Sequence, residues 1–445
     1  MIEKQFVTLP VRSVFIKLAM PGILSMVFSS IYMISDGIFV GRFIGEHALA
    51  AVNLVMPIAM IIFALSNMIA VGSSVKVAIA LGEGEIKKAK HLFSASVLII
   101  IGIGAIFSVL GIIFAKPLIY FLIKDTLLAE MAYKYLQVFM LSFPLIMPLF
   151  ALDNFLRTCG KAKYSMWVNI VVSLLNIVLD WFFIAHLRLG IEFSAISSVA
   201  SMFIGAIFSY APFFTKKITL HFTKPKMSFA EFRKIVYNGA SEFFSSIAGS
   251  FISTVINIFL LALGGAIAVA SYSIVMYIDT VLIGVLYGVL DAVSPAVSYN
   301  LGAKQTKRAF SFFKVCCIST AALSFLCLAV VMLFPGFLTS LFVKGDDPLM
   351  TTMTVNALLL FAPSYMFTWF NMVTSAFLTA MDKPKESMVI MVFRAIIFPL
   401  LCLFILTSVI GVYGVFFTPT ISSGLTFIVA FAIWKKCKKT VFTTH

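Results

Sequence analysis

Charged residues are scarce in this chain of 445 residues, since Asp, Glu, Lys and Arg make up 11% of it and hydrophobic residues 61%. The mean hydropathy is +1.08. A soluble domain contains about 25% charged residues, so the composition excludes an ordinary soluble protein. Cysteine is also rare: the six cysteines lack the paired spacing of a metal site. We therefore expect free thiols and no disulfide framework.

Two kinds of segment are missing as well. The N-terminal stretch MIEKQFVTLPVRSVFIK has no short apolar core followed by a small-residue cleavage site. We therefore expect no removable signal peptide. The Gly-Lys pair at Gly160 and Lys161 is followed by Ala and has no Gly five residues earlier, so it does not form a P-loop. This argues against an ATP-driven pump.

Long apolar stretches are what the sequence has in abundance. They run for about 20 to 30 residues between short polar breaks, which is the length a helix needs to cross a membrane. Such a pattern predicts an all-α integral membrane protein. Twelve membrane-spanning helices are predicted, at 14–40, 49–80, 92–114, 132–156, 165–186, 191–214, 235–263, 266–298, 310–342, 350–380, 388–409 and 412–434.

The basic residues indicate how these helices are oriented. The net charge is +15, and most of the 33 Lys and Arg lie before the first span, after the even-numbered spans or in the tail. The positive-inside rule then predicts cytoplasmic N- and C-termini in a plasma (inner) membrane. We interpret the charge as an adaptation to the lipid bilayer and its anionic headgroups, and we expect no nucleic-acid partner.

An internal repeat predicts the architecture. A shift of 220 aligns residues 45–90 with 265–310 without a gap. A shift of 222 aligns FLRTCGKAKYSM, from Phe155, with FLTAMDKPKESM, from Phe377. The repeat predicts two six-helix lobes related by a pseudo-two-fold axis along the membrane normal. The predicted divisions are an N-lobe at 1–214, a cytoplasmic linker at 215–234, and a C-lobe with a basic tail at 235–445.

Three polar side chains in the N-lobe spans have no polar counterpart in the repeat. They are Asp36 in the first span and, four residues apart on one face of the fifth, Asn176 and Asp180. The corresponding positions hold Ile256, Phe398 and Cys402. An Asp at the centre of a membrane helix costs about 2.5–3.5 kcal/mol on insertion scales, so we expect a function for these residues. The alternative is a hydrogen-bond cluster that joins the two helices.

Several motifs resemble those of the multidrug and toxic compound extrusion (MATE) transporters over essentially the whole chain. They are DGIFVGRFIGEHALAAV from Asp36, the LG and basic run after the second span, RTCGKAKYSM, and NIVLDWFFI followed by GIEFSAISSV. The resemblance is closest to the DinF-like branch. It implies a transporter and not an enzyme, with two lobes in a V and no cofactor. Its implied activity is export of lipophilic, mostly cationic drugs by antiport against protons or sodium.

The resemblance also implies a cation site made of Asp36, Asn176 and Asp180, with a hydroxyl from Ser198. Two Asp side chains in a low dielectric cannot both stay ionised without a counter-charge, so the site is expected to hold a proton or a cation. Asn176 and Ser198 supply neutral oxygens that suit sodium as well as a protonated Asp. The coupling ion is left open between H+ and Na+.

The C-lobe departs from one branch of the family. NorM-like members place coupling carboxylates on helices 7 and 10, but the span 350–380 has no Asp or Glu. Glu242, Asp279 and Asp291, together with Arg394, are candidates for a substrate cleft. The alternative is that each carboxylate pairs with a helix neighbour or with Arg394.

Three other charged residues are assigned structural roles. Lys76 is expected to extend to the cytoplasmic surface, and Asp153 and Arg157, four residues apart, are expected to form a structural pair.

The alternative to a drug exporter is a flippase for lipid-linked precursors from the same superfamily. Such proteins usually have more helices and several cationic cavity residues, whereas Arg394 is the single Lys or Arg deep in a span. We expect a monomer.

Overall fold

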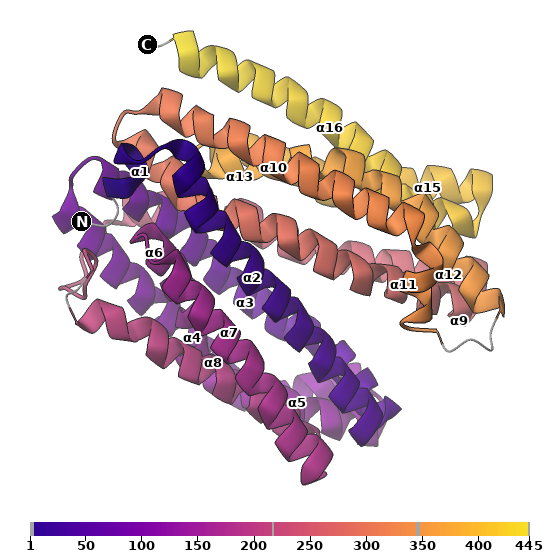
Figure 1. Cartoon of the computed structure of the whole chain (residues 1–445). Coiled ribbons are helices and arrows are strands. Elements are labelled where there is room, and N and C mark those ends of the chain that lie inside the picture. The colour runs from indigo at the N-terminus through magenta and orange to yellow at the C-terminus, as the bar shows by residue number, and fades with distance from the viewer. Residues whose placement is uncertain (1–3, 216–217, 344–347, 444–445) are drawn as a thin grey trace.

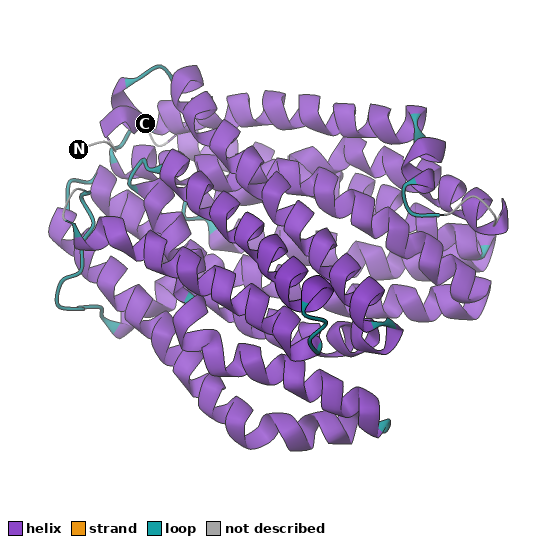
Figure 2. Cartoon of the chain, turned by 60° about the horizontal axis from the view of Figure 1, so that its bottom comes forward, coloured by secondary structure: helices purple, strands orange, loops and turns teal. Residues whose placement is uncertain are grey.

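The computed structural model describes residues 4–215, 218–343 and 348–443, and every regular element within these ranges is a helix (Figures 1 and 2). The elements of the first half are α1 (Gln5–Thr8), α2 (Val11–Phe39), η2 (Val40–Ile44), α3 (Glu46–Gly82), α4 (Ile86–Leu122), α5 (Thr126–Ile146), α6 (Pro148–Thr158), α7 (Ala162–Asp180), η3 (Trp181–His186) and α8 (Ile191–Phe214). Those of the second half are α9 (Phe229–Gly302), α10 (Thr306–Leu333), α11 (Pro335–Ser340), α12 (Pro348–Phe361), η4 (Ala362–Ser364), α13 (Tyr365–Ala380), α14 (Pro384–Val392), η5 (Phe393–Ile397), α15 (Phe398–Ile410) and α16 (Val412–Thr443).

These elements give twelve membrane crossings. Within the described residues 11 continuous helical stretches are long and apolar enough to span a bilayer, and one of them, α9, has 74 residues. Gly265 inside α9 has φ 65°, so the chain turns there and α9 makes two crossings. Gly45, its repeat counterpart, also has a positive φ, 121°, between η2 and α3. The all-α, twelve-helix prediction is thus confirmed, and both repeats place a glycine turn at the same position.

Two predicted spans differ from the observed helices. The span predicted at 92–114 belongs to a longer helix, α4, because its charged ends continue as helix beyond the apolar stretch. The span predicted at 310–342 is interrupted at Phe334, where the backbone leaves the helical region before Pro335. A residue that precedes proline is disfavoured in helical geometry, which explains the interruption.

The helices form two lobes that meet at one end and diverge toward the other (Figure 1). We call the meeting end, where α1 and the last turns of α16 lie, the terminal end. A hydrophobic core there contains residues of both lobes, such as Leu18 of α2 and Val293 of α9. A second core, which includes Ile256 and Leu403, belongs to the second half alone. Burial of apolar surface between the lobes is therefore concentrated at the terminal end.

Close glycine contacts join the lobes and follow the repeat. A Cβ built on Gly82 of α3 would lie 2.1 Å from the carbonyl oxygen of Tyr299 in α9. A Cβ on Gly302 of α9 would lie 2.1 Å from the carbonyl oxygen of Ile79 in α3. Ile79 and Tyr299 correspond under the shift of 220, so this contact is reciprocal, as a pseudo-two-fold axis requires.

Further contacts of this kind join the lobes. A Cβ on Gly22 of α2 would lie 2.0 Å from the oxygen of Gly288, and one on Gly239 of α9 would lie 1.8 Å from the oxygen of Met68. A Cβ on Gly72 of α3 would lie 2.1 Å from the oxygen of Ile235. Only glycine permits backbones to approach this closely. These residues define the glycine crossings used below.

Charged side chains add to the contact between the lobes. The Lys76 ammonium does not simply extend to the surface, as predicted; it forms an ion pair with Asp382 of the second half. At α1, the Arg308 guanidinium donates from Nε to the carbonyl oxygen of Phe6 at 2.9 Å. The Phe6 and Tyr299 rings pack edge to face with centroids 5.7 Å apart.

The connection between the two halves is not helical over residues 218–228. The Ser228 side chain then caps α9 by accepting a hydrogen bond from the Glu231 backbone. Lys216 and Lys217 of the predicted linker lie outside the described residues. The boundaries at 214 and 235 stay a prediction.

Candidate functional site

Four polar residues predicted from the sequence come together in the N-lobe. Asp36 lies near the end of α2, Asn176 and Asp180 lie on one face of α7, and Ser198 lies on α8. Asn176 donates from Nδ2 to Ser198 Oγ at 3.0 Å. Asp36 Oδ1 accepts a hydrogen bond of 2.8 Å from Ser194 Oγ, also on α8. The three helices therefore meet at a single polar point between apolar surfaces.

Asp180 lies at the centre of this group. Its side chain is fully buried, and it faces the Asp36 carboxyl and the Ser197 hydroxyl. Both Asp180 carboxyl oxygens and Asn176 Oδ1 lack a hydrogen-bond partner in the described structure. Buried polar atoms are nearly always hydrogen-bonded, because an isolated one costs several kcal/mol. This oxygen-rich group therefore fits a proton shared between carboxyls, or a hard cation such as sodium.

Sequence reasoning missed four residues of the group. Ser194 and Ser197 join Ser198 on one face of α8, since they are spaced at i, i+3 and i+4. Tyr32 lies one turn before Asp36 on α2, and Tyr135 of α5 approaches the same carboxyls. The helical spacing of the serines and of Tyr32 could have revealed them. Tyr135 could not be found this way because α5 is distant in sequence.

The helix irregularities of the N-lobe occur beside these residues. The π-helical segment η2 begins four residues after Asp36, and η3 begins directly after Asp180. The two segments contact each other. A π-helical turn adds one residue per turn and weakens the regular hydrogen-bond ladder, and such turns often mark functional sites. The arrangement gives both Asp-bearing helices a point at which they can repack.

The repeat counterparts of the site are apolar. Ile256 belongs to the core of the second half, and Cys402 is buried, with 3% of its surface exposed. Phe398 opens α15. The C-lobe therefore packs the same positions without a carboxylate, so the fold itself does not require one there.

The four candidates of the C-lobe are spread along α9 and η5. Asp279 accepts a hydrogen bond of 2.8 Å from Tyr365 Oη. Arg394, in η5, lies within electrostatic range of both Glu242 and Asp279. Asp291 lies within such range of Arg157, which belongs to the other lobe. The structure thus brings Glu242, Asp279 and Arg394 into one neighbourhood, while Asp291 faces the contact between the lobes.

The predicted pair of Asp153 and Arg157 is confirmed as structural. Arg157 Nη2 and Asp153 Oδ2 are 2.5 Å apart, and Asn169 donates to Asp153 Oδ1 at 3.0 Å. Arg157 is buried with 4% of its surface exposed, and Ser165 contributes hydrogen bonds to both partners. This network fastens α6 to α7 in the N-lobe.

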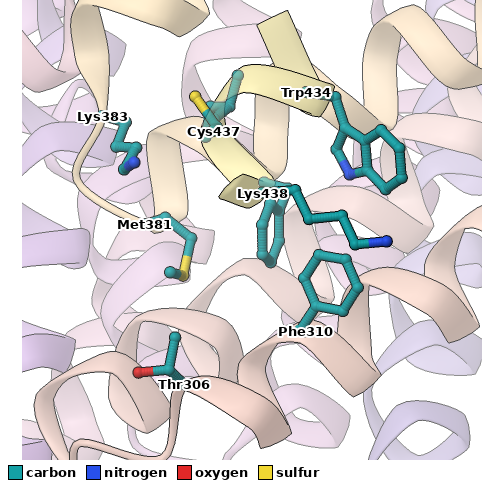
Figure 3. A pocket seen from close by; sticks show the side chains of 9 residues that line it. Thr306, Phe310, Met381, Lys383, Trp434, Cys437 and Lys438 are labelled. Carbon is teal, nitrogen blue, oxygen red and sulfur yellow. The ribbon is translucent and has the colours of Figure 1, made fainter. Parts of the chain in front are cut away.

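A small hollow lies away from all of these residues. Phe310, Met381, Trp434 and Lys438 line it at the terminal end of the C-lobe (Figure 3). Its volume is about 20 Å³, which is room for a single water molecule. Ligand pockets for drug-sized molecules are about 300–1,000 Å³, so this hollow does not suit such a substrate.

Comparisons with known proteins agree with the fold. A family model described as MatE matches residues 21–182 and 243–405. "Multidrug export protein MepA" of Staphylococcus aureus (strain MSSA476) is 26% identical over 437 residues, which cover 95% of this chain and 93% of that protein. The same-named protein of Staphylococcus haemolyticus (strain JCSC1435) is 26% identical over 401 residues, covering 89% of this chain and 87% of that protein.

Solved structures are similar over the whole chain. "Crystal structure of MATE in complex with MaL6" superposes with a TM-score of 0.94 at 22% identity and covers 99% of both chains. "Outward-facing conformation of a multidrug resistance MATE family transporter of the MOP superfamily" superposes with a TM-score of 0.92 at 22% identity and covers 98% of both chains. At this identity the likeness establishes the fold, which is the predicted arrangement of twelve helices in two lobes.

Proposed function

The chain belongs to the MatE family, and from this premise we propose that it is a multidrug efflux antiporter. It exports lipophilic, mostly cationic organic compounds by alternating access and takes up protons or sodium ions in exchange. The similarity to multidrug export proteins over nearly the whole chain supports this class of substrate. We propose that it acts as a monomer in the plasma membrane with both termini in the cytoplasm.

The observation that carries the proposal is the pair of facing carboxyls, Asp36 and Asp180, beside buried oxygens without partners. Two such groups repel each other when both are ionised in a low dielectric. A proton or sodium ion that enters between them removes the repulsion and lets α2 and α7 approach. Its release has the opposite effect, so occupancy of the site favours one arrangement of the helices.

Drug binding is coupled to this change through the cleft between the lobes. If a bound drug favours the arrangement in which the N-lobe site is vacant, drug and ion weaken each other's binding reciprocally, and that is the basis of antiport. Glu242 and Asp279 outnumber the neighbouring Arg394 and would give the cleft a negative potential, which favours cationic substrates. Most of the 47 Phe and 22 Met residues face lipid or pack between helices, and those that line the cleft would provide aromatic faces and flexible thioethers for lipophilic groups of varied shape.

Transport of ethidium into inverted membrane vesicles tests the proposal. A proton gradient and a sodium gradient are imposed separately, and uptake is compared between the wild type and Asp36→Asn. One of the gradients is expected to drive uptake in the wild type, and the amide variant is expected to lose it because it cannot exchange a cation. Failure of both gradients to drive uptake would favour the flippase alternative.

Glu130→Gln is the matched control. Glu130 is a carboxylate of the same lobe, but it forms an exposed ion pair with Lys134. Removing its charge is expected to leave uptake unchanged. Equal loss of uptake in both variants would mean that carboxylate removal acts through general damage to the lobe and not through the site.

A further inference from the structure

An ion pair crosses from one lobe to the other at the terminal end. Lys76 lies one turn after Gly72 in α3, and its ammonium pairs with the carboxylate of Asp382, two residues past the end of α13. Asn238, next to Gly239 in α9, donates from Nδ2 to Asp382 Oδ1 at 2.7 Å and to the Thr379 carbonyl oxygen at 3.3 Å. The pair thus sits directly beside a glycine crossing.

The repeat indicates that neither charge is needed for packing. The counterpart of Lys76 is Ala296, and the counterpart of Asp382 is Gly160. Gly160 has φ 72° and Asp382 has φ 57°, so both occupy left-handed backbone. Glycine adopts that conformation without strain, whereas Asp does so at an energetic cost. The chain therefore has a carboxylate at a position where its own repeat has glycine, the residue that adopts this backbone without strain. This points to a role for the charge.

The surroundings allow the pair to break and form again. The side chains of Lys76 and Asp382 are 19% and 32% exposed. A hollow of about 260 Å³ lies against them, and its other charged groups are Glu83, Lys88, Glu231 and Lys234. Water in such a hollow can hydrate both charges when they separate. A fully buried pair would be far more costly to break, and a fully exposed one would contribute almost nothing.

We propose that Lys76 and Asp382, with Asn238 as the positioning residue, form a latch that holds the lobes together at the terminal end. The latch closes when the opposite end is open and separates when the terminal end opens. This inference rests on the proposed alternating access. It adds that three residues outside the cation site set the ratio of the two states.

Single-molecule fluorescence energy transfer in liposomes tests the latch. Fluorophores are attached to Lys87→Cys and Lys307→Cys, which are exposed repeat counterparts in the two lobes. The six native cysteines form no disulfide in the described structure and five are buried, so labelling of the chain without added cysteines gives the background. The measured quantity is the dwell time of the state in which the terminal ends are close.

Asp382→Asn and Lys76→Met are the test variants. Asn tolerates left-handed backbone and keeps an oxygen for Asn238, while Met keeps the apolar stem of Lys76. Each is expected to shorten the closed-state dwell time about fivefold, as for loss of a partly exposed ion pair. The charge swap Lys76→Asp with Asp382→Lys is expected to restore most of the dwell time, and Lys304, with φ 57°, indicates that Lys tolerates this backbone.

Lys134→Met is the matched control, because Lys134 forms an exposed ion pair with Glu130 inside the N-lobe and does not line the hollow. Its dwell time is expected to equal that of the wild type. The latch would be overturned if both test variants kept the wild-type dwell time. It would also be overturned if the dwell time of the charge swap were as short as the two single effects added together. The measurement needs no drug, so a changed dwell time without dye export would refute the proposed function and leave the latch standing.

Discussion

Replacing Gly239 with Ala should force the lobes apart at the terminal end. A Cβ there would lie 1.8 Å from the Met68 carbonyl oxygen and 2.7 Å from its carbonyl carbon. Nonbonded heavy atoms pack at about 3.5 Å, so α3 and α9 must separate by about 1 Å or more. Overpacking of this kind costs about 1–3 kcal/mol. The clash exists only while the helices cross closely, so it raises the free energy of the closed state alone.

The expected result is a shift toward the state with an open terminal end by about 5-fold to 150-fold. The assay is the dwell time of the closed state, measured with fluorophores at positions 87 and 307. Drug export should fall together with the dwell time, because the chain can no longer hold the state that releases drug to the outside. Gly22→Ala should behave alike, since a Cβ there would lie 2.0 Å from the Gly288 oxygen.

Gly249→Ala is the control on the same helix. No atom lies within 4 Å of a Cβ at Gly249, so this change alters helix propensity without a clash. Its effect on the helix is about 0.5–1 kcal/mol in favour of Ala and is the same in both states. The reasoning is refuted if both variants fold and the closed-state dwell time of Gly239→Ala equals that of Gly249→Ala.

Four further predictions concern the candidate sites and the Asp153–Arg157 network. Asp180→Asn should reduce ion-driven export in a graded way, because Asp36 still carries one exchangeable charge; the initial rate of dye uptake measures this. Glu242→Gln should alter which drugs are exported but leave drug-dependent ion release from liposomes intact. Loss of ion release in Glu242→Gln, with retention in Asp36→Asn, would place the coupling site in the C-lobe. Resistance assays should show stronger protection against ethidium and quaternary ammonium dyes than against anionic detergents. Removing the Arg157 guanidinium with Arg157→Met should lower the melting temperature, because the partly buried Asp153 carboxylate loses its ionic partner.

The apolar stretches and the repeat determined the architecture without any coordinates. A segment that crosses the membrane must satisfy its own backbone hydrogen bonds, so a long apolar run forms an α-helix. The length of the run therefore suffices to predict the helix. The same reasoning brought Asn176 and Asp180 to one face of a helix, because a spacing of four is local geometry. Asp36 stood out because the repeat has an apolar residue, Ile256, at the corresponding position.

Contacts between distant segments could be decided only by the tertiary structure. The approach of Tyr135 to the two Asp carboxyls depends on how α5 packs against α3 and α8, and no local pattern encodes that. The pairing of Lys76 with Asp382 joins residues 306 positions apart, and the sequence alone suggested a lysine that merely reached the surface. Glycine positions were visible in the sequence, but their role in holding the lobes together arises from backbone contacts across two lobes. Local backbone geometry determined the helices, whereas packing between helices distant in sequence, within a lobe and across the two lobes, determined which side chains meet.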